Sequence, residues 1–212
     1  PLWYRGLGDV YKRQLLISGV HCLLINAKAL GSYEIVGQTI DDAVGEAFDK
    51  VSKLLDLGYP GGPLIEQLAA SGDSSAFNFP RPMANKDNLD FSFSGLKTSV
   101  FYALKEIDIL TQEIKANIAA SFQEAVAETL LIKSKKALEK TKQNELVIGG
   151  GVASNKYIRN RLINGLKGSQ IYFPPLERCT DNGAMVAFAG SFYINKNNHK
   201  KNDLVLPKWP LS

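Results

Sequence analysis

The sequence predicts an α/β domain, in which strands alternate with helices along the chain. Apolar runs of strand length occur at 15–17, 22–25, 145–148 and 170–173, each close to a glycine or proline turn signal. Longer segments between them repeat apolar residues every three or four positions, as amphipathic helices do. The chain has 212 residues, 45% of them hydrophobic and 22% charged, which suits an ordinary globular protein with a buried core.

The first elements are a predicted β-hairpin and the start of a helix. The runs 15–17 and 22–25 flank Ser18-Gly19, and a turn signal between two apolar runs is typical of a hairpin. Thr39 is followed three residues later by Asp42, which matches a capping box. We therefore expect a helix to begin directly after this pair.

Two helices joined by a rigid turn are expected next. Apolar residues at helical spacing predict a helix over 43–55, which Gly58 ends. Residues 59–63, Tyr-Pro-Gly-Gly-Pro, predict a turn, and a short helix is expected over 64–70. The following stretch, 73–95, is predicted to form loops.

Two further helices are predicted over 96–106 and over about 112–142. The longer one repeats apolar residues every four positions on one face. Lysines gather near its end, at positions 133, 135, 136, 140 and 142. Positive charges there complement the helix dipole, and we favour a solvated helix face over an RNA-binding patch.

The strongest physical signal for a ligand site follows the strand 145–148. This strand leads through Gly149, Gly150 and Gly151 into an amphipathic helix that ends near residue 166. Glycines let a ligand approach the backbone, and a helix N-terminus attracts anions, so the pattern favours a phosphate or nucleotide. A tight strand-to-helix turn is the structural alternative. The pattern is neither a GxGxxG fingerprint nor a P-loop.

For several carboxylates the sequence allows a structural role and a ligand-binding role. Asp181 precedes a helix expected over 184–194, so it is either an N-cap or a carboxylate held at a cleft to bind a metal. Asp41 and Asp42 are assigned as helix caps. Asp49 lies on the polar side of its helix, where it is solvated or accepts hydrogen bonds from a ligand hydroxyl.

Composition excludes several protein classes. No run of about 18 apolar residues occurs, so we expect no membrane span. Cys22 and Cys179 lie far apart, which speaks against a disulfide scaffold or thiolate zinc site and suits a reducing cytoplasm. The two histidines, His21 and His199, cannot build a three-histidine metal site, and His21 is expected to be packed. The net charge of +4 permits a nucleic-acid partner without requiring one.

Residues 1–14, PLWYRGLGDVYKRQ, do not fit the pattern that follows them. They lack a clean period and the layout of a signal peptide, and they resemble translated adapter sequence. We interpret them as a foreign junction segment, and expect the natural protein to start further upstream.

Six segments together carry a resemblance to one family. They are Ile40–Lys50, Tyr59–Pro63, Phe79–Met83, Asp90–Thr98, Gly150–Asn155 and Cys179–Met185. In this order they resemble the bacterial tRNA N6-adenosine threonylcarbamoyltransferases of the TsaD family. The likeness extends from Leu15 to Trp209, and six ordered motifs are far more specific than any one of them.

The resemblance implies a fold, a domain division and a reaction. The fold would be a ribonuclease-H-like lobe of the actin-like, sugar-kinase-like ATPase fold, with helical additions. Residues 15–195 would form the C-terminal lobe, and the tail 196–212 would pack on a missing N-terminal lobe. The family transfers a threonylcarbamoyl group from threonylcarbamoyl-adenylate to N6 of the tRNA adenosine adjacent to the anticodon. Its partners are tRNA and accessory proteins of the TsaB and TsaE type.

The resemblance also implies site residues, although it assigns none a catalytic role. The residues that would contact the adenylate are Leu16, Ile17, Ser18, Gly19, Val20, Asp49, Gly62, Gly150, Gly151 and Asn155. Asp181 would be a ligand of one divalent metal, for which we expect iron, with zinc as the alternative. A cation that polarises the carbamoyl carbonyl fits the attack of an amine on that group.

The sequence departs from the family at two places. Residues 18–22 read Ser-Gly-Val-His-Cys, where the family has Ser-Gly-Gly-His-Thr. Val20 is β-branched and tolerates positive φ poorly, and Cys22 replaces a hydroxyl with a weaker hydrogen-bonding group. The family's His-x-x-x-His metal pair lies upstream of the matched segment. We therefore expect this chain alone to be inactive.

Two other functions remain open on the sequence. A different actin-like-fold phosphotransferase or carbamoyltransferase would share the glycine segment, but not the segments Asp90–Thr98 and Cys179–Met185. A non-catalytic scaffold paralogue would be expected to have lost the cleft motifs, most of which are intact here.

Overall fold

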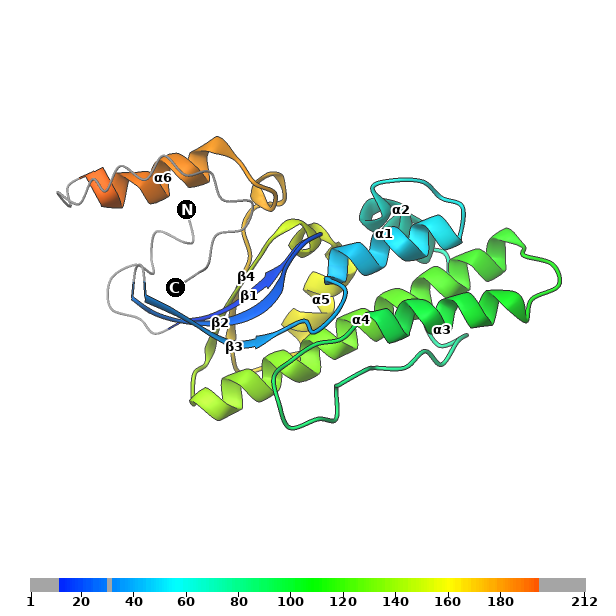
Figure 1. Cartoon of the computed structure of the whole chain (residues 1–212), viewed down its shortest axis with the longest axis horizontal. Coiled ribbons are helices and arrows are strands. Elements are labelled where there is room, and N and C mark those ends of the chain that lie inside the picture. The colour runs from blue at the N-terminus through cyan, green and yellow to red at the C-terminus, as the bar shows by residue number, and fades with distance from the viewer. Residues whose placement is uncertain (1–11, 30–31, 195–212) are drawn as a thin grey trace.

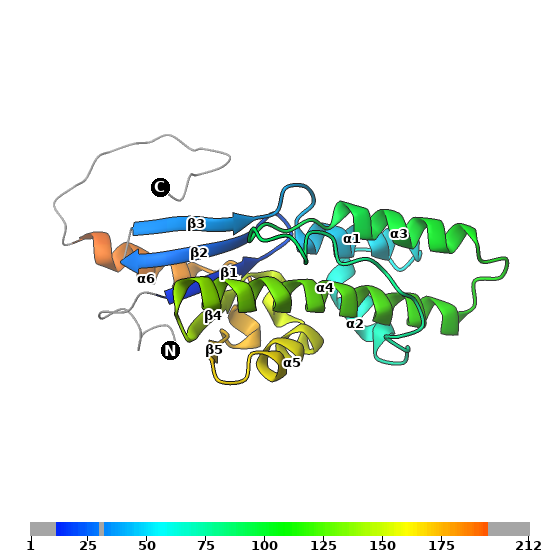
Figure 2. The same cartoon turned by 90° about the horizontal axis from the view of Figure 1, so that it is seen from below.

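A computed structural model describes residues 12–29 and 32–194. Its centre is a mixed five-stranded sheet with the order β3-β2-β1-β4-β5. The strands are β1 (Lys12–Ile17), β2 (Cys22–Ala29), β3 (Ser32–Gln38), β4 (Glu145–Gly149) and β5 (Gln170–Tyr172). Figures 1 and 2 show α4 and α5 on one face of the sheet and α6 on the other.

The predicted hairpin is confirmed. β1 and β2 pair antiparallel, with Ile17 opposite Cys22, and β2 pairs in turn with β3. β4 and β5 instead run parallel to β1, as strands joined through helices do. Leu15, Ile17 and Leu24 are completely buried, so the alternate residues of the hairpin supply the centre of the core.

The boundary expected at residue 14 lies inside β1. Residues 12–14 pair with β2, and Arg13 also pairs with Leu146 of β4. Arg13 is only 5% exposed, and its Nε donates a hydrogen bond to Thr141 Oγ1 at 2.9 Å. The sheet therefore starts three residues earlier than expected, because the backbone of any residue can join a ladder. Residues 1–11 and the expected tail from residue 196 lie outside the described residues.

The expected helices form, with ends shifted by a few residues. They are α1 (Val44–Leu54), α2 (Gly61–Ala69), α3 (Ser94–Lys105), α4 (Gln112–Thr141), α5 (Lys156–Gly165) and α6 (Gly183–Ile194), with short 3₁₀ turns η2 (Gly151–Ser154) and η3 (Leu176–Arg178). Figure 2 shows that α4 crosses the sheet and continues alongside α2 and α3, and its apolar face buries Ile118, Phe122, Val126 and Leu130 completely. Phe122 meets Phe48 of α1 edge to face, with ring centroids 5.0 Å apart.

The expected capping box at Thr39 and Asp42 is wrong. The cap position is Ala43, whose N–H donates to Glu46, while the Thr39 hydroxyl donates to the Asp42 carbonyl at 2.7 Å. Asp42 instead pairs with Lys50 at 2.7 Å. A hydroxyl three residues before a carboxylate thus formed a local turn rather than a helix start.

Asp41 caps a helix, but not the one that follows it in sequence. Its carboxylate accepts hydrogen bonds from the Phe93 N–H at 2.8 Å and from the hydroxyls of Ser92 and Ser94 at 2.6 and 2.8 Å. These groups lie at the N-terminus of α3. Asp41 therefore ties the entrance of α1 to the start of α3.

The lysines at the end of α4 are not all solvated, which corrects the expected helix face. Lys133 is completely buried, and its ammonium donates to the backbone carbonyls of Lys86 and Asn88. Lys136 and Lys140 donate to carbonyls of the same loop. Spacing of three and four residues places these lysines on one side of the helix, where they hold the loop. None of the described helices has the length and apolar character that crossing a membrane requires.

Candidate functional site

The candidate site lies where β1 and β4 end. The two strands are parallel, with Leu16 opposite Gly149, so the turn after β1 and the turn after β4 meet at one edge of the sheet. The carboxyl ends of parallel strands are where α/β folds bind ligands. The sequence assigned residues to both turns but could not show that they are neighbours.

The turn after β1 is held in place by Ser18. Its hydroxyl oxygen accepts hydrogen bonds from the N–H groups of Val20 and His21 at 3.2 and 2.9 Å. Its carbonyl accepts from the Gly45 N–H at 3.0 Å. A Cβ at Gly45 would lie 2.8 Å from Gly19, so α1 can approach this turn only with glycine there. Gly45 was missed by the sequence reasoning, although a glycine within a helical pattern signals such a contact.

The other predicted contacts of this turn differ in exposure. Ile17 is buried in the core and Leu16 is half-buried, so these two residues face the site through their backbone. Gly19 is open, since a Cβ there would meet no atom of the described residues within 4 Å. Val20 is 73% exposed and is not among the described residues with positive φ, so the expected backbone conflict does not arise. Cys22 is completely buried, and this burial raises the pKa of its thiol.

The three glycines after β4 have different roles. Gly150 has φ of 96°, and a Cβ there would lie 2.2 Å from the Ile17 carbonyl oxygen. Gly150 is therefore required by the turn itself. Gly149 is open, and a Cβ at Gly151 would make only an ordinary contact of 3.8 Å with Thr180. Gly150 thus serves the turn, as the structural alternative predicts, whereas Gly149 and Gly151 have space that the turn itself does not require.

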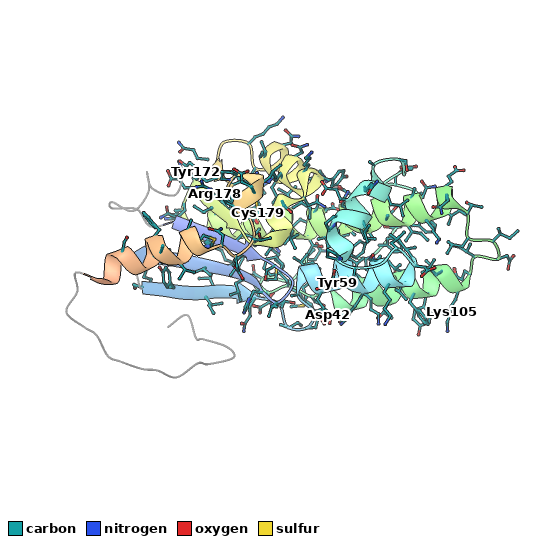
Figure 3. The ribbon with its side chains drawn as sticks, turned by 90° about the horizontal axis from the view of Figure 1, so that it is seen from above. Asp42, Tyr59, Lys105, Tyr172, Arg178 and Cys179 are labelled. Carbon is teal, nitrogen blue, oxygen red and sulfur yellow. The ribbon has the colours of Figure 1, made fainter. Side chains whose placement is uncertain are left out.

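Asp49 and Gly62 lie at the junction of α1 and α2. Asp49 Oδ1 accepts a hydrogen bond from the Gly61 N–H at 2.7 Å, which fixes the start of α2. Gly61 packs against α1, whereas the next residue, Gly62, is open, with no atom within 4 Å of an added Cβ. Figure 3 shows Asp42 and Tyr59 near this helix junction.

Both polar atoms of the Asn155 side chain form hydrogen bonds within the fold. Its Oδ1 accepts from the Ile158 N–H at 2.9 Å and caps α5, and its Nδ2 donates to Gln123 Oε1 at 2.8 Å. The side chain is 95% buried, since Asn155 is 5% exposed. Asn155 therefore positions the turn, and Gln123 is a partner that the sequence did not reveal.

Asp181 is not the cap of α6. The cap is Asn182, whose Oδ1 accepts from the Met185 N–H at 3.0 Å. Asp181 is exposed, and among the described residues its carboxylate forms no hydrogen bond or ion pair. The preceding residue, Thr180, lies close to Gly151, so the chain passes the glycine turn directly before Asp181.

The described residues do not make a complete metal centre. Within 12–29 and 32–194, no three His, Cys, Asp or Glu side chains come together as a metal-binding group. Asp181 is a suitable hard oxygen donor, but a catalytic divalent site uses about three protein ligands. Within the described residues, Asp181 is therefore a single candidate ligand.

Comparison with solved structures identifies the fold. The structure resembles full-length HypF in its phosphate- and nucleotide-bound form, with a TM-score of 0.69 and 14% identity over 89% of this chain and 33% of that one. HypF of T. kodakarensis gives a TM-score of 0.56 and 19% identity over 78% and 21% of the two chains. The activator of the 2-hydroxyisocaproyl-CoA dehydratase from Clostridium difficile, with bound ADPNP, gives 0.53 and 16% over 96% and 67%. The expected actin-like ATPase fold is confirmed.

The sequence match is more specific than these structural likenesses. The model of the family TsaD, tRNA N6-adenosine threonylcarbamoyltransferase, matches residues 10–188. That range includes both turns of the candidate site, Asp49, Gly62 and Asp181. The chain spans only a third or less of the two HypF chains. It belongs to the TsaD family of tRNA N6-adenosine threonylcarbamoyltransferases.

Proposed function

We propose that this chain holds threonylcarbamoyl-adenylate, from which the threonylcarbamoyl group passes to N6 of the tRNA adenosine adjacent to the anticodon. The observation that carries the proposal is the parallel pairing of Leu16 with Gly149, which brings two open backbone turns to one edge of the sheet. Backbone N–H groups beside uncluttered glycines are suited to a phosphate. Membership of the family supplies the identity of the group transferred.

Different residues would bind different parts of the adenylate. The turns at Gly19 and Gly151 would receive the phosphate, because both are open to approach. Asp49 uses Oδ1 for the Gly61 N–H, which leaves Oδ2 for a ribose hydroxyl next to the open Gly62. Gly150 and Asn155 would shape the turn without offering their side chains.

The reaction itself is an acyl transfer. The adenosine N6 forms a bond to the carbamoyl carbon, the bond between that carbon and the phosphate oxygen breaks, and adenosine monophosphate leaves while N6 loses a proton. Donors that hold the phosphate stabilise the charge that develops on this leaving group. A divalent metal, iron or its alternative zinc, would polarise the carbonyl when bound. Asp181 is the group of this chain that would help to hold it.

The complete activity would need more groups than the described residues of this chain provide. The other metal ligands, the tRNA-binding surface and the accessory proteins of the TsaB and TsaE type belong to the proposal for the whole enzyme. We infer that the chain forms the adenylate side of the cleft, and that the reaction takes place in the cytoplasm.

The test is the formation of modified nucleoside. The chain, alone and within a longer protein that includes the upstream coding sequence, is incubated with tRNA, threonylcarbamoyl-adenylate and the accessory proteins. Nucleosides from digested tRNA are then measured by mass spectrometry. We expect threonylcarbamoyladenosine with the longer protein only, and its loss in that protein with Asp181→Ala. A longer protein that binds adenylate and leaves tRNA unmodified would contradict the proposal.

A second candidate is a nucleotide-dependent transferase that acts on another acceptor. The likeness to HypF in a phosphate- and nucleotide-bound form favours it, although 14% identity shows the fold alone. The same incubation separates the two, because the alternative predicts that tRNA remains unmodified and that the adenylate is not consumed while its own acceptor is absent.

A further inference from the structure

Arg159 in α5 joins three segments that meet at the candidate site. Its guanidinium donates to the carbonyl of Ala153 in η2 and to the carbonyl of Pro174, the latter at 2.7 Å. It also donates to Cys179 Sγ at 3.0 Å. The guanidinium carbon lies 4.6 Å from the ring centroid of Phe173, over its face. One side chain thus connects the glycine turn to the segment that leads into α6.

These contacts place Asp181 between two anchored neighbours. On one side, Cys179 is 4% exposed and is held by Arg159. On the other, Asn182 caps α6. Asp181 itself forms no hydrogen bond or ion pair among the described residues, so its position depends on these anchors. Cys179 is labelled in Figure 3, beside the neighbouring Arg178.

We propose that Arg159 is the positioning residue that holds the segment leading to Asp181 against the glycine turn. The inference rests on the proposed function, in which Asp181 and this turn serve one substrate. Arg159 suits the task because its planar guanidinium can donate to several acceptors in fixed directions, whereas a lysine can satisfy fewer of them. Arg159 acts through these backbone contacts and is not expected to touch the adenylate.

The experiment uses the thiol of Cys179 as a reporter. Cys22 is completely buried, so its thiol should not react with a thiol reagent while the fold is intact. The 212-residue chain and its variants Arg159→Met and Arg159→Lys are treated with a chromogenic disulfide reagent, and the rate of thiolate release is followed by absorbance. Arg178→Met is the matched control, because Arg178 is exposed and has no side-chain hydrogen bond or ion pair among the described residues. Affinity for adenosine monophosphate is measured by calorimetry on the same samples.

We expect Arg159→Met to react about tenfold or more faster at Cys179, because it loses the hydrogen bonds to Ala153, Pro174 and Cys179 that hold the segment burying this thiol. Its affinity for adenosine monophosphate should fall as well, because the Arg159 contact to Ala153 is lost. Arg159→Lys should lie between Met and the parent, and Arg178→Met should match the parent in both measurements. If Arg159→Met is too unstable to study, the Lys variant carries the same comparison.

Two results would overturn the inference. One is a parental rate of thiol reaction in the Arg159 variants. The other is a faster rate with unchanged nucleotide affinity, which would make Arg159 a support of the 174–179 segment alone. Failure of the parent chain to bind adenosine monophosphate would instead count against the proposed function, while the thiol rates would still decide the role of Arg159.

Discussion

Leu16 of β1 lies opposite Gly149 of β4 in a parallel pairing, and this register fixes the geometry of the candidate site. A shift by one residue would turn every side chain of β1 to the other face of the sheet. It would also move the Ser18 turn away from Gly150, which now packs directly on the Ile17 carbonyl. The site is therefore a consequence of strand register more than of any single polar side chain.

The contact between Gly150 and Ile17 can be measured by substitution. Gly150→Ala places a side chain at positive φ and 2.2 Å from the Ile17 carbonyl oxygen, so we expect a loss of about 2–4 kcal/mol in the free energy of unfolding. Gly168→Ala is the control, because Gly168 has φ of 93° but open space around it. Denaturant titrations of the two variants should differ, and equal losses would show that the Ile17 contact is unimportant.

Asp41 makes stability depend on pH. Partial burial opposes ionisation of Asp41, but hydrogen bonds from Ser92, Phe93 and Ser94 outweigh it and lower the pKa of the carboxyl. A lowered pKa stabilises the folded state above the unfolded value of about 3.9, and this gain is lost as the pH falls through the folded pKa. Asp41→Asn should cost about 1–3 kcal/mol at pH 7 and progressively less below pH about 4.

The control for Asp41 is Asp108→Asn, since Asp108 is exposed and has no hydrogen bond among the described residues. Thermal denaturation from pH 3 to pH 7 gives both curves. If the difference in melting temperature between Asp41→Asn and the parent does not change with pH, the stabilisation does not come from the ionised Asp41 carboxylate.

Lys133 is expected to matter more for folding than its neighbour Lys135. Lys133→Met removes hydrogen bonds to the carbonyls of Lys86 and Asn88, so it should cost about 1–3 kcal/mol. Lys135 is exposed and forms no hydrogen bond or ion pair within the described chain, so Lys135→Met should change stability by less than about 0.5 kcal/mol. Urea denaturation measures both, and equal effects would argue against the loop-holding role.

Arg13 is expected to destabilise the chain. It lies on the same face of β1 as Leu15, is 5% exposed, and its buried Nη1 has no hydrogen-bond partner within residues 12–29 and 32–194. Arg13→Leu should therefore raise the free energy of unfolding by about 1–3 kcal/mol, because an unsatisfied buried donor is removed. Thr141 keeps its bond to the Ala137 carbonyl in the variant. Lower stability of Arg13→Leu than of the parent chain would contradict this account.

The sequence predicted the hairpin, the six described α-helices and the strand-glycine-helix motif, because each depends on local periodicity and turn residues. It could not predict the partner of Asp41, which lies 52 residues away at Phe93. Nor could it distinguish Asn182 from Asp181 as the cap of α6, because both residues are good caps and only the backbone path decides. The buried position of Lys133 was missed for a similar reason, since Asn88, in the loop that covers it, precedes Lys133 by 45 residues.

The most direct test of the account is a calorimetric titration of the chain with adenosine monophosphate. Gly151→Val adds bulk where the ligand is expected, and its Cβ meets only a 3.8 Å contact, so the fold should tolerate it. Gly190→Ala in α6 is the control, because that glycine is equally open but belongs to no proposed contact. We predict binding by the parent and by Gly190→Ala, and affinity weakened about tenfold or more in Gly151→Val, as expected where a phosphate contact is blocked. Absence of binding by the parent chain, or equal affinity in Gly151→Val, would contradict the central claim.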